Sequence, residues 1–142
     1  MPAIKPIQAG AKDLPDHHVS RMWVTHSTSS IQDDTNWTDI LSMNVSVDES
    51  GHLLTLACLN VSRSSSSLDP IARVRIRVNA NTSPNFVVGA WQPVGRLHNH
   101  FLSHLWELSP GTYTVALQMQ RVANWARITA GHRALVAILL KR

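Results

Sequence analysis

Apolar and polar residues alternate along most of this chain from Ser20 onward. The clearest segment is Ile40–Asp48, which reads ILSMNVSVD. Side chains two residues apart share one face of a β-strand, so this segment predicts a strand with one dry and one wet face. No segment shows a convincing helical period, and without helical crossovers a parallel α/β sheet is excluded.

Turn signals divide the chain into about nine such segments. They include Asp48-Glu-Ser-Gly51, Asn79–Asn85, Ser109-Pro-Gly111 and Ala130-Gly131-His132. After a first strand beginning near Ser20, strands are predicted at 40–48, 52–61, 72–78, 85–94, 96–108, 112–121, 124–129 and 133–140. Many short strands separated by turns indicate an all-β fold, an antiparallel β-sandwich of the jelly-roll type.

Two predicted strands, His52–Val61 and Arg133–Leu140, are apolar on both faces. A sandwich strand normally has one wet face, and soluble monomers rarely expose large apolar patches. We therefore expect an oligomer in which copies of the chain cover these strands, although loops or the N-terminal segment can also cover them. The expected interface residues are Leu54, Leu56, Cys58, Ala134, Val136, Ile138 and Leu140.

Residues 1–19 contain Pro2, Pro6 and Pro15 and show no period. They predict an extended N-terminal arm ahead of one domain at 20–142, a length that can bury a sizeable core. The arm is either a disordered tail or a segment that becomes ordered on a neighbouring subunit.

Charge and composition exclude several classes of protein. The net charge is +4 with eight His neutral, and the only compact basic set is Arg73, Arg75 and Arg77, so nucleic-acid binding is not expected. A single cysteine, Cys58, excludes an intrachain disulfide and a multi-cysteine zinc site. The N-terminus has no apolar signal region, and no apolar run is long enough to span a membrane. We expect synthesis in the cytoplasm, followed by placement on a virion or particle surface or release by a non-Sec route.

Two sets of residues are candidates for ligand binding. His98, His100 and His104 share parity on one predicted strand, so their imidazoles project from one face. They are expected at the surface or at a subunit interface; a metal ring on a symmetry axis is the alternative. Tryptophans beside polar residues are suited to stacking and hydrogen bonding with sugars. The candidate ligand contacts are Trp91, Arg96, His98, His100, Asn124, Trp125 and Arg127.

Catalysis is not expected, because acids are scarce. Glu107 is the only acid after Asp69, and no P-loop, dinucleotide glycine motif or HExxH sequence is present. The sequence therefore predicts a non-enzymatic protein that carries neither a cofactor nor a metal.

Four motifs in the second half resemble those of one known superfamily. They are ARVRIRV (72–78), LSPGTYTV (108–115), NWARI (124–128) and LVAILL (135–140). Together they resemble the jelly-roll domains of the tumour-necrosis-factor-like and complement-head-like superfamily, which bacteria and phages use in trimeric lectins, fibre tips and particle-surface proteins. The resemblance covers roughly residues 70–142. It implies a homotrimer with the PGxYxV strand and the C-terminal strand close to the three-fold axis.

Two functions agree with these features. The first is a homotrimeric binding module that presents a surface to a glycan or another cell-surface ligand. The alternative is a structural virion protein, such as a phage decoration or fibre component, that binds other capsid or tail subunits through its arm and trimer base.

Overall fold

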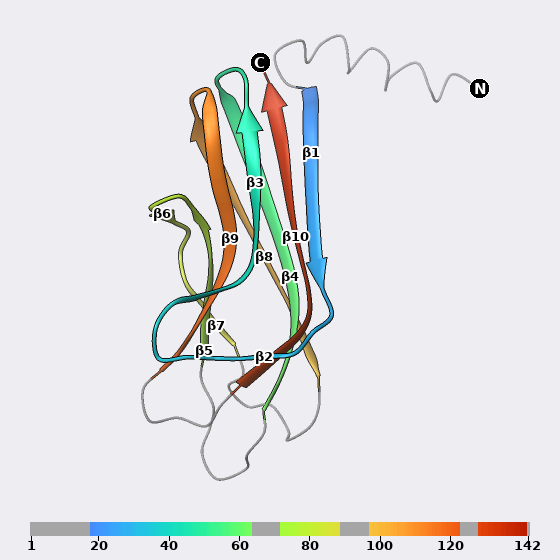
Figure 1. The fold of residues 1–142 in the computed structure, drawn as a ribbon, viewed down its shortest axis with the longest axis vertical. Helices are drawn as coiled ribbons and strands as arrows, with labels where there is room; N and C mark the ends of the chain where they lie inside the picture. Colours follow the sequence, from blue (N-terminus) through green and yellow to red (C-terminus); the bar gives the residue numbers. More distant parts are fainter. Residues whose placement is uncertain (1–17, 64–71, 89–96, 123–127, 142) are drawn as a thin grey trace, which may run out of the picture.

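A computed structural model describes residues 18–63, 72–88, 97–122 and 128–141 of the chain. These residues form ten strands and no helix, so the predicted all-β sandwich is confirmed, with ten strands in place of about nine (Figure 1). The strands are β1 (His18–Ser27), β2 (Ile31–Gln32), β3 (Thr38–Val47), β4 (Gly51–Arg63), β5 (Ala72–Val78), β6 (Asn81–Thr82), β7 (Phe86–Val88), β8 (His98–Leu108), β9 (Gly111–Arg121) and β10 (Ile128–Lys141). In the described ranges, then, no helix is available to span a membrane.

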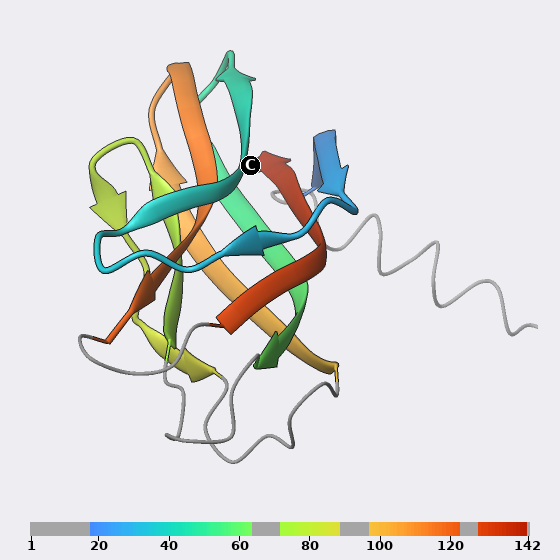
Figure 2. The ribbon, with the colours of Figure 1, turned by 60° about the horizontal axis from the view of Figure 1, so that its bottom comes forward.

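The strands form two antiparallel sheets. Sheet A has the order β1-β10-β4-β8, with β2 paired to β10. Sheet B has the order β3-β9-β5-β6, with β7 paired to β5. The sheets pack face to face, so that β1 and β10 lie across from β3 while β8 lies across from β5 (Figures 1 and 2). The last strand, β10, lies between β1 and β4 and is not an edge strand.

The core lies between the two sheets and consists of the inward side chains of each strand. In β3 and β9 the predicted alternation is confirmed, because Val45, Val47, Val115 and Leu117 point inward and are buried. The largest fully buried side chains are Leu53, Leu59, Ile76, Leu117, Met119, Leu135 and Leu139. The packed interior thus takes one apolar face from each sheet, as expected for a sandwich.

The predicted turn at Ala130-Gly131-His132 is wrong. β10 runs continuously from Ile128 to Lys141, and its pairing with β4 is irregular between Ala130 and Arg133. A Cβ atom at Gly131 would lie 2.6 Å from the side-chain oxygen of Asn60. Glycine here permits a close approach within a bulged ladder and does not reverse the chain.

Arg133, directly after this irregularity, is buried and fixes β10 to its surroundings. Its Nε donates to the Ile40 carbonyl at 2.5 Å, and its Nη1 donates to the Ser29 carbonyl at 2.6 Å and the Gly131 carbonyl at 2.8 Å. Burial lowers the pKa of the guanidinium. One side chain thereby joins β10 to β3 and to the segment between β1 and β2.

Several predicted segments lie outside the described residues. The N-terminal arm is outside except for His18 and Val19, which open β1. Of the strand predicted at 85–94, only the β7 residues Phe86–Val88 are described as strand. The strand predicted at 124–129 is described only from Ile128, which opens β10.

Candidate interaction faces

The side chains of sheet A that point away from sheet B form a nearly continuous apolar surface, the outer face of sheet A. Its apolar members are Val19, Met22, Val24, Leu54, Leu56, Cys58, Phe101, Leu105, Ala134, Val136, Ile138 and Leu140. They come from all four main strands of the sheet. The hydrogen-bonding register places them in rows across it, such as Met22, Ile138, Leu54 and Leu105.

Several of these side chains are highly exposed. The exposed fraction is 78% for Phe101, 60% for Met22 and 58% for Val24. Single exposed apolar residues are ordinary, but here exposed ones on β1, β4 and β8 are joined by half-buried apolar residues on β10, which makes a larger apolar surface than a soluble monomer usually exposes.

All seven residues predicted for the oligomer interface lie on this face. Five further members of this face were not predicted: Val19, Met22, Val24, Phe101 and Leu105. In β1, Met22 and Val24 alternate with Arg21 and Trp23. Such an alternation is also typical of a strand with a single apolar face, so it gives no sign that Met22 and Val24 lie on the outer face of the sheet.

The centre of this face is hollowed into an apolar groove of about 430 Å³. Leu56, Cys58, Phe101, Ala134 and Val136 are among the residues that line it. A second hollow of about 360 Å³ shares Cys58, Phe101 and Ala134 with the groove and continues it to a polar rim. The rim residues are His26, Asn60, Asn99 and His132.

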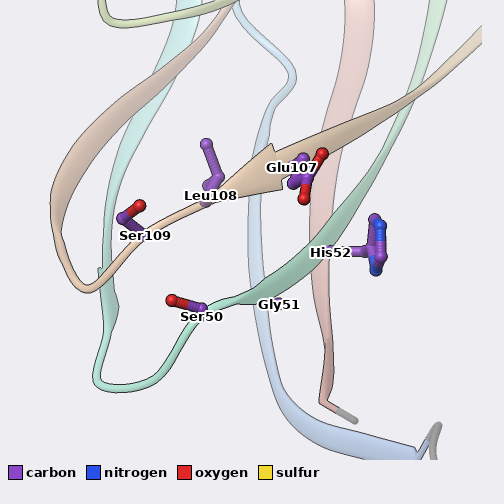
Figure 3. Close-up of a pocket in the computed structure, with 6 residues that line it drawn as sticks. All are labelled: Ser50, Gly51, His52, Glu107, Leu108 and Ser109. Carbon is purple, nitrogen blue, oxygen red and sulfur yellow. The ribbon is translucent and has the colours of Figure 1, made fainter.

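A third hollow, of about 350 Å³, lies at the opposite end of the same sheet (Figure 3). It is lined by Ser50, Gly51, His52, Glu107, Leu108 and Ser109, from the β3–β4 and β8–β9 connections and the strand ends beside them. His52 and Glu107 are partners across the β4–β8 ladder. The apolar face therefore has polar groups at both of its ends.

His98, His100 and His104 share one face of β8, as predicted, and all three side chains are half-buried. This face is the inward one, because Leu102 and Trp106, which have the same parity, are buried. The His104 and Trp106 rings meet edge to face with centroids 4.4 Å apart. The larger apolar burial of Trp106 and Leu102 sets the orientation of the strand, which turns Phe101 and Leu105 outward.

The inward histidines are held in a partly dry environment. Trp106 Nε1 donates to Thr55 Oγ1 at 2.9 Å, and the Thr55 hydroxyl donates to the His104 carbonyl at 3.1 Å. Burial, and secondarily the positive charge of His98, lowers the pKa of His100. The neutral imidazole is therefore the favoured form inside the sandwich.

The remaining predicted ligand contacts fall outside the described residues: Trp91, Arg96, Asn124, Trp125 and Arg127. Within the described ranges, no group of three or more His, Cys, Asp or Glu side chains is placed to hold a metal ion. Of the predicted ligand set, only His98 and His100 have a described position.

The outer face of sheet B, which points away from sheet A, is polar. Arg77 Nη2 lies 2.6 Å from Asp39 Oδ2, and Gln118 Nε2 donates to Asp39 Oδ1 at 2.8 Å. Arg75 Nε donates to Gln118 Oε1 at 2.8 Å, and its guanidinium carbon lies 3.8 Å from the centroid of the Trp37 ring. We call these five residues the polar network of sheet B.

The sequence predicted that Arg73, Arg75 and Arg77 point outward, and this is confirmed by the burial of Val74, Ile76 and Val78 between them. It did not predict their partners. Asp39 and Gln118 lie on other strands, and Trp37 lies before β3 in the chain, so strand periodicity alone carries no signal of their meeting.

Comparison with known proteins shows the fold alone. No protein-family model matches the chain, and no curated protein sequence matches it. The resemblance to tumour-necrosis-factor-like domains therefore has no family match in its support. A solved structure of infectious bursal disease virus, Gt strain, is 14% identical with a TM-score of 0.54, over 85% of this chain and 34% of that one.

Two further solved structures are similar to this chain. Dimeric latent PorU from Porphyromonas gingivalis is 9% identical with a TM-score of 0.60, over 89% of this chain and 13% of that one. The sugar-binding EclA C-terminal domain is 12% identical with a TM-score of 0.49, over 77% of this chain and 78% of that one. The chain thus spans about a third of the viral chain and a smaller part of PorU.

Proposed function

We propose that this chain is a non-enzymatic homotrimeric binding module. The outer face of sheet A is buried between subunits, and the outer face of sheet B is turned toward a glycan or another cell-surface ligand. The observation that carries the proposal is the apolar outer face of sheet A, with its groove of about 430 Å³.

Energetics favour covering this face. Fully burying one large apolar side chain stabilises by about 1.5–3 kcal/mol. Val19, Met22, Val24, Phe101 and Leu105 are each more than half exposed. Their burial together contributes on the order of 10 kcal/mol, which is comparable with the roughly 4–15 kcal/mol that association costs. The half-buried residues between them add to the gain.

A second copy of the chain is the partner that fits best. Sheet A presents four paired strands, which at about 4.8 Å per strand spacing give a face wide enough for another sheet or sheet edge. Closed symmetry lets every copy bury the same face without leaving an open end. The three-fold number comes from the resemblance of the second half of the chain to trimeric jelly rolls. Of the two strands that the resemblance puts near the axis, the proposed interface includes only the C-terminal one, β10, because the PGxYxV segment opens β9 in sheet B.

The mass of the assembly by light scattering tests this proposal. We expect three times the chain mass for the unaltered protein and the chain mass for Leu56→Asp, because an unpaired charge would be buried at the interface. The matched control is Ser42→Asp, at an exposed position on β3 in sheet B, which should keep the trimer mass. A monomeric unaltered protein would contradict the proposal.

A second candidate is a structural subunit of a virus particle, which binds other capsid or tail subunits through the N-terminal arm and the trimer base. The sandwich shared with the infectious bursal disease virus chains supports it. Electron microscopy of particles from the native source tests it, since a structural subunit must be present at stoichiometric copy number. Its absence from particles would reject this candidate and leave the first one standing.

A further inference from the structure

We propose that the outer face of sheet B binds the carboxylate or sulfate groups of an acidic glycan, with Arg73 and Arg75 as the anion-binding pair. This deepens the proposed function, on which it rests, by naming the ligand class of the face turned away from the subunit interface.

The spacing of the arginines gives a row of cations. Arg73, Arg75 and Arg77 occupy alternate positions of β5, so neighbouring stems are separated by about 6.6–6.8 Å along the strand. The partners across the ladder are also polar, with Gln120 opposite Arg73 and Gln118 opposite Arg75. The result is a positive strip bordered by amides on the β9 side, whereas on the other side Val87 of β7 lies opposite Arg73.

The charge of this strip is only partly compensated. Asp39 uses Oδ2 for Arg77 and Oδ1 for Gln118. Within the described ranges, no carboxylate forms an ion pair with Arg73 or Arg75. Burial, and secondarily the charge of Arg77, lowers the pKa of Arg75. An anion placed between Arg73 and Arg75 would supply the missing negative charge.

The Arg75 guanidinium is held in place before any ligand arrives. The Trp37 ring lies against it at 3.8 Å, and the bond to Gln118 fixes its Nε. That bond does not occupy the Nη groups, which form the planar fork that matches carboxylate and sulfate oxygens. A fixed fork loses less conformational entropy on binding than a free arginine does.

The rest of the face favours a glycan over a nucleic acid. Ser42, Asn44, Thr114 and Gln120 supply hydroxyl and amide groups, which are suited to sugar hydroxyls; Thr114 and Asn44 are already hydrogen bonded at 3.1 Å. Proteins that bind single-stranded nucleic acid stack bases on aromatic rings. On the described part of this face the aromatic ring is Trp37, and Arg75 covers one side of it.

The experiment measures binding of the full chain to four probes by calorimetry: heparin, alginate, neutral dextran and a single-stranded oligonucleotide. We expect heparin or alginate to bind more tightly than either of the other probes. Arg75→Gln should weaken that binding about tenfold or more, the effect of one charge-assisted hydrogen bond. Arg75→Lys, which keeps the charge but lacks the fork, should also weaken it.

Arg21→Gln is the matched control, because Arg21 also lies over a tryptophan, 5.7 Å from the Trp23 ring centroid, but on sheet A. It should change affinity by less than about twofold, since only diffuse charge is lost. If Arg75→Gln does not fold, Arg73→Gln carries the test, because Arg73 is exposed on its strand.

Equal losses for Arg21→Gln and Arg75→Gln would overturn the inference, as would dextran or oligonucleotide binding as tight as that of the acidic glycans. Light scattering on the same samples keeps the two proposals separate. Acidic-glycan binding by a monomer would uphold this site and reject the trimer. A trimer that binds neither heparin nor alginate would uphold the trimer and reject this site.

Discussion

Leu56 and Gln118 lie near the middle of the outer faces of sheets A and B. Leu56 is 37% exposed and lines an apolar groove. Gln118 is 7% exposed because Asp39 and Arg75, to which it is hydrogen bonded, cover it. Around Gln118 the polar side chains of sheet B are hydrogen bonded to one another, whereas around Leu56 sheet A presents an apolar groove. The two sheets of this sandwich therefore present outer faces of different chemistry.

Removal of Phe101 from the apolar face should have the largest effect. Because this side chain is 78% exposed in one chain, Phe101→Ser should leave folding nearly unchanged. Loss of its burial in the assembly should cost about 1.5–3 kcal/mol per subunit contact, which lowers the association constant about 10- to 100-fold. Sedimentation over a range of concentrations measures the change. Val87→Ser, also exposed but paired in sheet B, is the control, and equal effects of the two would remove the distinction between the faces.

Removal of Gln118 should affect folding and leave assembly intact. Gln118→Ala leaves the Arg75 Nε and one Asp39 oxygen without their partner, which should cost about 1–3 kcal/mol of folding free energy. Urea unfolding measures this cost, and light scattering should give an unchanged mass. Gln120→Ala, a half-buried neighbour on the same strand whose Nε2 donates to the Thr35 carbonyl, should cost less. A lower assembly mass with an unchanged free energy of unfolding would contradict a role for Gln118 in folding alone.

Acid should weaken folding through the interior of the sandwich. The folded pKa of His100 lies below its ordinary value of 6.5, so the unfolded chain takes up the proton at higher pH. The free energy of unfolding should therefore fall as the pH drops through 6.5 toward the folded pKa. His100→Gln should reduce this loss, measured by urea unfolding at fixed protein concentration. An unchanged pH dependence in His100→Gln would show that other groups dominate it.

The ion pair on sheet B should have the smallest effect. The Arg77 and Asp39 side chains are 23% and 37% exposed, and such pairs contribute about 0.2–1 kcal/mol. Asp39→Asn should lower the melting temperature slightly, and by less in high salt, which screens exposed charges. Salts such as sulfate should at the same time strengthen association through sheet A. If high salt strengthened both the contribution of the ion pair to the melting temperature and the association through sheet A, or weakened both, the two faces would not differ in chemistry as described.

Much of the fold could be predicted from alternation alone. The one-sided segments at β3 and β5 and the two-sided segments at β4 and β10 all occupy the predicted faces, because a period of two fixes which side chains share a side. The seven predicted interface residues fall together on one face for the same reason. Their role between subunits stays a prediction.

The alternation of apolar and polar residues could not predict which side of an isolated strand points inward. In β8 the choice depends on Trp106 and Leu102 packing against the opposite sheet, which is a tertiary effect. The network of Trp37, Arg75 and Gln118 joins three segments far apart in the sequence, so its geometry appears only after the strands are ordered in space. The turn predicted at Gly131 is wrong because glycine permits both turns and bulges, and its presence alone does not distinguish them.

The central place of β10 has a consequence for how this protein is made. Its partners β1 and β4 are synthesised long before it, and each offers an unpaired edge until residues 128–141 leave the ribosome. Exposed edges are sites of mispairing between nascent chains. Because β1 and β10 lie at opposite ends of the described sequence, their pairing closes a very long loop, and folding should be slow and nearly all-or-none at its last step. A chain stalled before β10 would lack sheet A as a continuous unit and would be a natural target for chaperones.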